Sequence, residues 1–479
     1  MSSLFQDLSP AAPFRYFEEI SAIPRASGNE AGIAAYLCDF ASARGLFCYE
    51  DEIHNVLIKK PATAGREAEA PLLLQCHTDM VAEKHGHVTH DFEKDGIQLV
   101  REGNILRADG TTLGADDGFG VALILAVLAD DTLSHPALEC LFTVSEEIGL
   151  EGANAFDYSR ISARRMINLD SAEEDTVIVG CCGGLRTDLT VPLCFEAVEA
   201  TGLRVTVGGL CGGHSGEDID RGRLNAHVLM GAVLRELQAV TPFRFASISG
   251  GDKDNAIPRE CEVVILPEDL AAAEGFLANA AVHVADCVVA EEDRGLCLTA
   301  SRAGLCRVAA TEDTERILSI LSVRNGVLYS RTVPPLMPET SRNLARLRTE
   351  AEHLAVAFSS RSEKEERIAE SRAELDALAA ELGGSTHHHA GYPGWVSPAD
   401  APLVRSWQRA YLETTGKETA AAMIHAGLEC GLISAALPGL TAISVGCNIH
   451  DLHTPAETME LDSMAAIYQT LCRFLQKRA

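Results

Sequence analysis

Two adjacent acidic residues, Glu146 and Glu147, follow an apolar run in the stretch 140-CLFTVSEEIGLEG-152. Two carboxylates at the end of a buried segment repel each other and lose hydration, so a cation or a proton is expected to balance their charge. A single acid at this position would be interpreted as a surface residue. The pair instead indicates a site at which carboxylates hold a metal ion or transfer a proton.

Histidine and acidic residues also follow other segments that are typical of strands. They come directly after such segments or at the start of a helix: 77-HTD-79, 116-DD-117, Asp170, His450 and His453. In open α/β sheets the loops at the carboxyl ends of the strands converge on one edge, where ligands bind. Two imidazoles and three carboxylates from such loops suit two zinc ions that share one bridging carboxylate.

Each of these residues has a simpler interpretation when it is taken alone. A histidine or aspartate after a strand is more often a turn former or a helix cap. Asp116 could cap a helix that starts at Asp117, and Asp117 could replace Asp116 as a ligand. His450 competes with His453 in the same way. The dinuclear site is therefore predicted by the number of such loops, and not by any one residue.

The elements that must position these residues alternate between strands and helices. Two helices over 11–45 are predicted around a loop at 23–30, and an apolar helix is predicted over 117–130. Short apolar strands are predicted over 71–76, 138–144, 165–170 and 440–446. This alternation predicts an α/β domain with a mostly parallel, buried sheet.

The pattern changes to a mixture of strands and helices typical of an α+β domain between about 185 and 395. One succession has strands over 203–209, 244–250 and 259–266 and helices over 222–239 and 267–281. A similar succession follows over 305–310, 311–323, 344–349, 353–360 and 363–383. We therefore predict a catalytic domain formed by 1–184 and 396–479 and an inserted, duplicated lid domain over 185–395. The segment 384–395, which holds three histidines, is predicted to be an exposed linker.

The composition narrows the classes of partner. The net charge of −29 disfavours binding to phosphate backbones or anionic lipid. No apolar run approaches the roughly 18 residues of a membrane span, and the N-terminal segment lacks the pattern of a secretory signal. The 15 cysteines include no CxxC pair and suit reduced thiols. A cytoplasmic protein is expected.

Several runs, in this order along nearly the whole chain, resemble the zinc peptidases of the aminoacylase/carboxypeptidase clan. They are 75-QCHTDMV-81, 112-TLGADDGFG-120, 143-TVSEEIGLEG-152, 168-NLDS-171, 209-GLCGGHSGEDI-219 and 448-NIHDLHTPAE-457. Two more runs are similar to the aminoacyl-histidine dipeptidase branch, the bacterial Xaa-His dipeptidases that hydrolyse carnosine-like substrates. These are 254-DNAIPRE-260 and 424-IHAGLECG-431.

The resemblance implies two divalent metal ions, Zn²⁺ in the first place, with Co²⁺ or Mn²⁺ as alternatives. The implied ligands are His77 and Asp170 on one ion, Glu147 and His453 on the other, and Asp116 as the bridge between them. The family pattern further implies a cis peptide bond between Asp116 and Asp117.

The same resemblance implies two roles beside the metal ligands. Asp79 would accept the second N–H of His77 and so orient its ring. Glu146 would act as the general base towards water and then as the acid towards the leaving amine. Glu147 would then be a ligand, so the two adjacent acids would have different tasks.

Residues of the lid domain are implied to bind the substrate. His214 and Asn255 would donate to the tetrahedral oxyanion. Arg361 would pair with the C-terminal carboxylate, and the glycine turn at His425 and Gly427 would offer backbone N–H groups to it. Taken alone, GGHSG is a simple glycine turn and Arg361 a surface charge. Capture of both charged ends would limit substrates to dipeptides.

The predicted function is a metal-dependent dipeptidase for Xaa-His and other unblocked dipeptides. The alternatives are a tripeptidase, an N-acyl amino acid deacylase or a carboxypeptidase of the same clan, and a non-catalytic metal-binding relative. Neither nucleic acid nor membrane is expected as a partner. The resemblance implies a homodimer.

Overall fold

The computed structural model describes residues 4–332 and 336–478, and the chain forms two compact units. Unit 1 extends to Cys181 and resumes over Trp395–Met423 and from Leu428 onward, whereas unit 2 comprises Cys182–Gly394 and Ile424–Gly427. Each unit has its own hydrophobic core, with Phe119 and Trp407 in the first and Phe245 in the second. The sequence predicted a catalytic domain over 1–184 and 396–479 and an inserted domain over 185–395. These domain boundaries stay a prediction.

Unit 1 contains, among the described residues, a nine-stranded sheet of mixed orientation. Its four central strands are parallel neighbours, in the order β6 (Leu138–Thr143), β3 (Leu72–His77), β7 (Arg165–Ser171) and β22 (Thr441–Gly446). On either side of these strands the pairing is antiparallel, between β1 (Phe47–Glu50) and β2 (Val56–Lys60), between β2 and β6, between β22 and β8 (Thr176–Cys181), and between β8 and β20 (Trp395–Val396). A further strand, β21 (Ala420–Ile424), pairs with β8. The predicted α/β fold is confirmed, with the parallel part confined to the centre.

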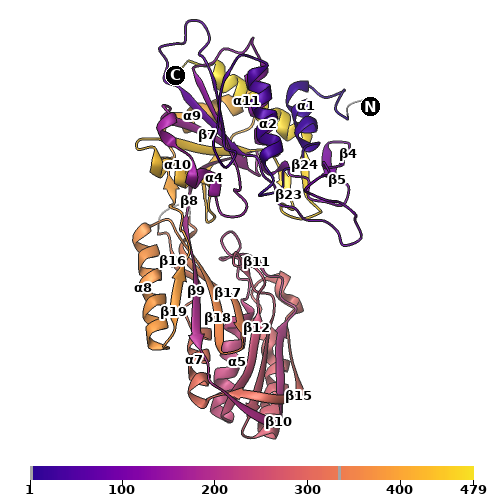
Figure 1. Cartoon of the computed structure of the whole chain (residues 1–479), viewed down its shortest axis with the longest axis vertical. Coiled ribbons are helices and arrows are strands. Elements are labelled where there is room, and N and C mark those ends of the chain that lie inside the picture. Colours follow the sequence, from indigo (N-terminus) through magenta and orange to yellow (C-terminus); the bar gives the residue numbers. More distant parts are fainter. Residues whose placement is uncertain (1–3, 333–335, 479) are drawn as a thin grey trace. The chain divides into compact units, whose positions relative to one another are not determined.

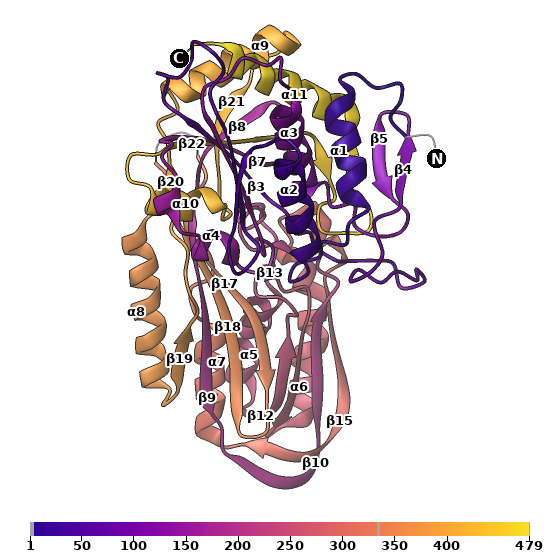
Figure 2. The same ribbon diagram turned by 45° about the horizontal axis from the view of Figure 1, so that its top comes forward.

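Helices cover the central strands and explain their continuous apolar sequence. Every residue of β3 and β6 is buried, because strands that are packed on both faces lose the alternation of polar and apolar residues. Helix α3 (Ala115–Ala129) packs on β3 and β7 and against α1 (Ala11–Ser21), as Figure 2 shows. The remaining helices of unit 1 are α2 (Ala31–Ser42), α4 (Glu151–Ala155), α9 (Pro402–Thr415), α10 (Glu429–Ala436) and α11 (Leu461–Gln476).

A small antiparallel sheet positions one of the site loops in unit 1. Its strands, in order, are β23 (Ile449–His450), β24 (Thr458–Glu460), β5 (Ile105–Ala108) and β4 (Leu99–Glu102). The hairpin between β23 and β24 carries His453, and β5 leads into the turn before α3. The two segments, far apart in the sequence, are therefore held side by side.

Unit 2 is built on a second nine-stranded sheet, again counted over the described residues. Its strands, in order, are β15 (Cys297–Ala309), β10 (Phe195–Gly208), β14 (Cys261–Pro267), β12 (Phe243–Gly250), β17 (Pro338–Thr349), β18 (His353–Ser362), β9 (Gly183–Pro192) and β19 (Ser385–His388), with β16 (Gly326–Ser330) on β17. The helices are α5 (Ala226–Val240), α6 (Leu270–His283), α7 (Thr311–Leu321) and α8 (Glu365–Glu381). Both predicted successions of elements contribute to this one sheet, and their duplication stays a prediction.

The predicted linker over 384–395 is partly wrong. Residues Ser385–His388 form β19, which pairs antiparallel with β9, and α8 lies along the same two strands (Figure 1). His388 Nε2 lies 2.9 Å from an oxygen of Asp376, and His389 Nε2 lies 2.6 Å from one of Asp188. His388 and His389 thus each contact a carboxylate, and the pairing with β9 makes this polar segment a strand.

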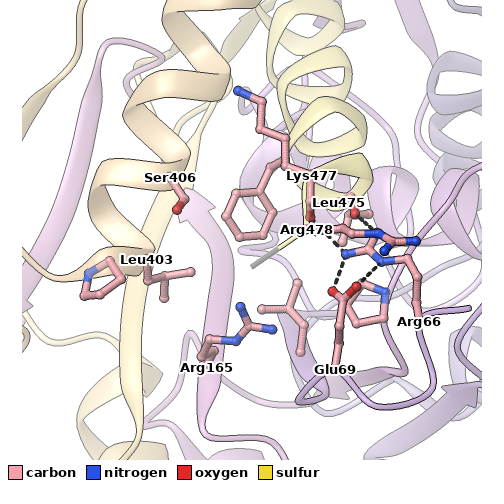
Figure 3. Close-up of a pocket in the computed structure, with 12 residues that line it drawn as sticks. Arg66, Glu69, Arg165, Leu403, Ser406, Leu475, Lys477 and Arg478 are labelled. Carbon is pink, nitrogen blue, oxygen red and sulfur yellow. Dashed lines mark hydrogen bonds and ion pairs between the residues drawn. The ribbon is translucent and has the colours of Figure 1, made fainter.

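Arg66, which is 3% exposed, holds the C-terminal end of α11 within unit 1. Its guanidinium donates to Glu69 (Nε to Oε1, 2.8 Å), to the carbonyl of Lys477 at 2.9 Å and to that of Leu475 (Figure 3). These groups border a cavity of about 120 Å³ that Arg165 also lines. None of the predicted site residues lines this cavity, so its contacts are interpreted as structural.

The described helices include none that is both long and apolar enough to cross a membrane. All 15 cysteines lie within the described residues, and all are free thiols.

A buried histidine in α5 is expected to make the stability of unit 2 depend on pH. His227 is 0% exposed, and burial lowers its pKa to about 4. An unfolded histidine titrates near 6.5, so below that pH the unfolded chain binds a proton that the folded chain does not. The contribution is therefore intact above pH 6.5 and is lost as the pH falls towards 4. We expect unfolding in urea to require about 2 kcal/mol less at pH 5 than at pH 7 on this account. His227→Gln should lack that part of the difference, and equal pH dependence in both proteins would contradict the assignment.

Candidate active site

Unit 1 brings the predicted ligands together at the carboxyl ends of its central strands. Three groups of side chains each offer ligand atoms that lie within 4.8 Å of one another. These groups are His77 with Asp116 and Asp170, Asp116 with Glu147 and His453, and His77 with Glu146 and Glu147. His77 ends β3, Asp170 lies in β7, Asp116 opens α3, and the two glutamates follow β6. The predicted convergence is therefore present.

Asp116 lies between the two histidines. One of its oxygens, Oδ1, is 3.1 Å from His77 Nε2, and the other, Oδ2, is 3.2 Å from His453 Nε2. His77 Nε2 is also 3.8 Å from Asp170 Oδ1, and His453 Nε2 is 3.0 Å from Glu147 Oε1. A carboxylate that presents one oxygen to each of two ligand groups has the arrangement needed for a bridge. The predicted cis peptide bond between Asp116 and Asp117 is confirmed.

The electrostatics of this cluster fit divalent cations. Burial raises the pKa of Glu147 and, well above the usual range, those of Glu146 and Asp170, and neighbouring carboxylates add to each effect. Glu147 Oε1 is buried, and His453 Nε2 lies 3.0 Å from it. Carboxylate and imidazole groups that converge in this way are the ligand types of zinc, cobalt and manganese sites. The residues present therefore fit metal ions.

The two histidines respond to the same carboxylates. Against the opposing effect of burial, hydrogen bonds to Asp116 and Glu147 raise the pKa of His453 to about 11. The pKa of His77 is likewise raised, by Asp116 and Asp79. Burial alone would raise the pKa of Asp116, but the hydrogen bonds from both histidines hold it below the usual value. This negative cluster attracts positive charge of any kind, which is the property a metal site requires.

Asp79 contacts both the ring of His77 and the backbone of the two glutamates. Its Oδ1 lies 3.3 Å from His77 Nδ1, and its backbone carbonyl lies 3.1 Å from the same nitrogen. The carboxylate also accepts the backbone N–H of Glu146 at 3.0 Å and that of Glu147 at 3.3 Å. Because Ser145 has a φ of 52°, the chain turns sharply there and presents both N–H groups to Asp79. The sequence suggested the contact with His77, but not the hold on the two glutamates.

The alternatives that the sequence left open occupy different surroundings. Asp117 is buried, and its carboxylate accepts the backbone N–H groups of His77 at 3.2 Å and Gly120 at 3.1 Å. His450 is exposed, and its Nε2 lies 3.2 Å from Glu460. Neither residue belongs to a group of converging ligands among the described residues. The geometry therefore favours Asp116 and His453.

Two further buried residues shape the turn before α3. Glu457 accepts the backbone N–H groups of Leu113 and Ala115, each at 2.8 Å, and of Gly114 at 3.1 Å. Arg25 is 2% exposed and donates to the backbone carbonyls of Thr78, Asp79 and Gly114. Gly114 has a φ of +67°, and a Cβ there would meet Arg25 at 2.7 Å. The run 23-IPRASGNE-30 gave no signal that its arginine would be buried.

Glu457→Gln is expected to weaken metal binding about 10- to 100-fold, because the new amide group would face backbone N–H donors and release the turn that carries Asp116. Competition with a metal-sensitive chelating dye would measure the metal Kd directly. Glu52→Gln, in an exposed turn, is the matched control. An unchanged Kd in the Glu457 variant would show that this contact does not support the ligand.

Behind the site, Glu429 is fully buried at the start of α10. It accepts hydrogen bonds from Gln75 at 2.5 Å and Thr143 at 2.7 Å, and Gln75 in turn accepts one from Asn168 at 2.7 Å. Burial raises the pKa of Glu429 to about 7. The network crosses β3, β6 and β7 just before their ligand-bearing ends. The run 424-IHAGLECG-431 drew attention to this segment, but not to its glutamate.

Unit 2 brings its own predicted residues together. Strands β11 (Gly213–His214) and β13 (Ala256–Ile257) pair, so His214 lies opposite Ala256, the residue after Asn255. Arg361 is 6% exposed, and its Nη2 lies 3.3 Å from His214 Nε2. Its Nη1 donates to the hydroxyl of Tyr392 at 2.9 Å. Far from being a surface charge, Arg361 is thus buried beside His214.

The glycine turn packs against the same tyrosine. A Cβ on Gly427 would lie 2.4 Å from the ring of Tyr392, and one on Gly184 would lie equally close to it. His425 is 5% exposed, and its Nε2 is 2.7 Å from the hydroxyl of Ser341. Tyr392 is thus a contact of Arg361 that sequence reasoning missed, since GYPGW was interpreted as a linker.

Comparison with known proteins places these observations in a family context. Residues 73–477 match the model of Peptidase family M20/M25/M40. The chain is 34% identical to the cytosol non-specific dipeptidase of Escherichia coli strain K12 over 484 residues, which covers 100% of this chain and 99% of the relative. Its structure is similar to that of aminoacylhistidine dipeptidase from Vibrio alginolyticus, with a TM-score of 0.82, 32% identity and coverage of 100% and 99%. Aminopeptidase PepT from Bacillus cereus, at 16% identity, 97% coverage of each chain and a TM-score of 0.56, shares the fold.

Proposed function

The chain belongs to Peptidase family M20/M25/M40, and from this premise we propose that it is a metal-dependent dipeptidase for unblocked dipeptides, Xaa-His among them. The family membership confirms the resemblance that the motifs predicted. One observation carries the proposal: converging histidine and carboxylate ligands in unit 1 have Glu146 beside them. The relatives from E. coli and V. alginolyticus, which are dipeptidases by name, align with the whole chain and support dipeptides as substrates.

The proposed cofactor is a pair of zinc ions, with Co²⁺ or Mn²⁺ as alternatives. When bound, such ions polarise the scissile carbonyl and acidify the attacking water. The residues proposed to hold them are His77, Asp116, Glu147, Asp170 and His453. Their support is the spacing of the ligand atoms and the position of Asp116 between both histidines.

Glu146 is proposed to move the proton. Its carboxylate would accept a proton from water and then donate it to the amine nitrogen of the leaving residue. Glu147 faces His453, whereas Glu146 makes no such contact within hydrogen-bond distance among the described side chains. Asp79 would fix the position of the Glu146 backbone relative to the His77 ring, since it contacts both.

Unit 2 is proposed to act as a lid that supplies substrate contacts. Arg361 and the glycine turn at His425 and Gly427 would bind the C-terminal carboxylate, while His214 and Asn255 would donate to the oxyanion. The 3.3 Å separation of Arg361 Nη2 and His214 Nε2 supports a common substrate-binding region for these two residues.

The experiment that tests the function is a comparison of substrates. The purified protein with Zn²⁺ would be incubated separately with four compounds: carnosine, a second unblocked dipeptide, a tripeptide and an N-acetyl amino acid. The released amino acids would be quantified by chromatography. We expect hydrolysis of the dipeptides at least about 100-fold faster than of the other two compounds. Release only from the N-acetyl amino acid would discard the dipeptidase assignment, and preferred release from the tripeptide would assign a tripeptidase.

Gly427→Ala is expected to raise KM about 10-fold or more with a smaller change in kcat. The new Cβ would lie 2.4 Å from the Tyr392 ring, and Tyr392 accepts a hydrogen bond from Arg361. Gly275→Ala, in α6 with no atom within 4 Å of the new Cβ, is the matched control. Steady-state kinetics with a dipeptide measure both constants. A normal KM in the Gly427 variant would remove this turn from substrate binding.

Location and assembly belong to the same proposal. A cytoplasmic location is supported by the name of the E. coli relative. A homodimer is proposed from the family resemblance and is checked by light scattering of the purified protein.

A further inference from the structure

Two cysteine thiols in unit 1 lie closer together than ordinary non-bonded sulfur atoms. Cys38, in α2, and Cys48, in β1, have their Sγ atoms 3.2 Å apart. Both side chains are half-buried. Disulfide formation requires a sulfur separation of about 2.05 Å, so the two sulfurs need to move by little more than 1 Å.

A series of side-chain contacts leads from this pair through a carboxylate to the surface. The thiol of Cys38 donates to Glu50 Oε2 at 3.6 Å, and Glu50 Oε1 lies 2.7 Å from His54 Nδ1. The side chain of Glu50 is 35% exposed, so a small oxidant can approach the sulfurs from this side. Burial, the contact with Cys48 and the charge of Glu50 raise the pKa of Cys38 to about 12. The pair is therefore expected to react slowly at neutral pH and faster as the pH rises.

The elements that carry the thiols both hold the loop that carries Glu146 and Glu147. At the start of α2, Glu30 Oε1 accepts the backbone N–H of Ser145 at 3.0 Å and its hydroxyl at 2.9 Å. After β1, Asn55 accepts the N–H of Val144 at 3.1 Å and donates to the carbonyl of Gly152 at 3.0 Å. A covalent link between α2 and β1 would thus join the two supports of residues 144–152.

From this geometry we propose that Cys38 and Cys48 are a redox modification site, which hydrogen peroxide converts into a disulfide that restrains the loop 144–152. In the first step the sulfur of Cys38 attacks a peroxide oxygen, the O–O bond breaks, one water leaves and a sulfenic acid forms. In the second step the sulfur of Cys48 attacks the sulfur of Cys38, the S–O bond breaks and a second water leaves. The two thiols lose two electrons, and hydrogen peroxide is reduced to water.

The test uses the full chain and does not depend on its enzymatic activity. The protein is treated with hydrogen peroxide at pH 8.5, remaining thiols are alkylated, and tryptic peptides are analysed by mass spectrometry. Cleavage after Arg25, Arg44 and Lys59 gives peptides 26–44 and 45–59, each with one cysteine. We expect these two peptides to be linked, with the loss of two hydrogens, and to separate on reduction. Cys38→Ser and Cys48→Ser should each abolish the linked species.

A second measurement tests the restraint on the loop. Amide hydrogen exchange over residues 144–152 is expected to be slower in the oxidised than in the reduced protein, and unchanged by peroxide in Cys48→Ser. The site is overturned if Cys38 and Cys48 stay alkylated as free thiols while the exposed Cys287 and Cys306 are oxidised, or if either is linked to another cysteine. A disulfide without any change in exchange would overturn the proposed restraint. Because neither readout uses hydrolysis, failure here is distinguishable from failure of the proposed dipeptidase function.

Discussion

Glu146→Gln is expected to lower kcat by at least about 100-fold while leaving the metal content near normal. Glutamine matches glutamate in size, so it preserves the turn after β6, but its amide cannot take up a proton from water. The backbone N–H of residue 146, which Asp79 accepts at 3.0 Å, is untouched by the substitution. Steady-state kinetics with a dipeptide, together with elemental analysis of the same sample, separate loss of proton transfer from loss of metal.

The control for this variant lies a few residues further along the same loop. Glu151 is exposed at the start of α4, so Glu151→Gln changes the loop's charge equally without touching the cluster. Equal turnover by wild type and Glu146→Gln would remove Glu146 from the mechanism. A simultaneous loss of metal would instead assign it to the ligand set, as its place beside His77 and Glu147 allows. A non-catalytic metal-binding relative would show no turnover in any of these proteins.

The central strands were predictable because their apolar runs are short, continuous and buried. The predicted 138–144 and 165–170 correspond to β6 and β7, and the predicted helix 117–130 corresponds to α3. Local sequence carries this information, since strands covered on both faces need apolar residues throughout. The edge strand β1 was not predicted, because it is only half-buried and is defined by its pairing with β2. The polar β19 likewise exists through its pairing with β9.

The candidate metal ligands were predictable as a set more readily than as individuals. The choice of Asp116 over Asp117 came from the resemblance, and the structure adds the reason for its geometry. Asp117 turns into the core and accepts two backbone N–H groups, whereas Asp116 faces His77 and His453. No spacing rule separates two adjacent aspartates at the start of a helix. The turn that precedes Asp116 is held by Glu457, which accepts the N–H of Ala115.

The contacts of the buried charged residues could not be predicted from the sequence. The role of Arg25 as a donor to three backbone carbonyls depends on the approach of segments that are 53 to 89 positions away. The pairing of Arg361 with Tyr392 and His214 depends on sheet register in the same way. Such contacts follow from tertiary packing, which short motifs do not encode.

Removal of divalent metal is expected to abolish hydrolysis, and Zn²⁺, Co²⁺ or Mn²⁺ should each restore it. The physical reason is the charge of the cluster: burial raises the pKa of Glu146 and Asp170, which favours the protonated form of these carboxyl groups when no cation balances their charge. A protonated Glu146 cannot accept a proton from water, and the peptide carbonyl would lack its polarising charge. Dialysis against a chelator, followed by stepwise addition of each metal during a dipeptide assay, measures both loss and recovery.

Metal stoichiometry makes the same expectation sharper. Asp116 belongs to two of the three ligand groups found among the described residues, whereas Asp170 belongs to one. We therefore expect Asp116→Asn to weaken binding of both ions and Asp170→Asn to weaken mainly one. Elemental analysis against a series of metal concentrations distinguishes these outcomes. Activity that survives exhaustive chelation, or identical metal binding by wild type and Asp116→Asn, would contradict a metal site at this edge of the sheet. Glu146 lies beside the ligands and is not needed as a bridge between them. Its substitution should therefore lower turnover, whereas substitution of Asp116 should first weaken metal binding.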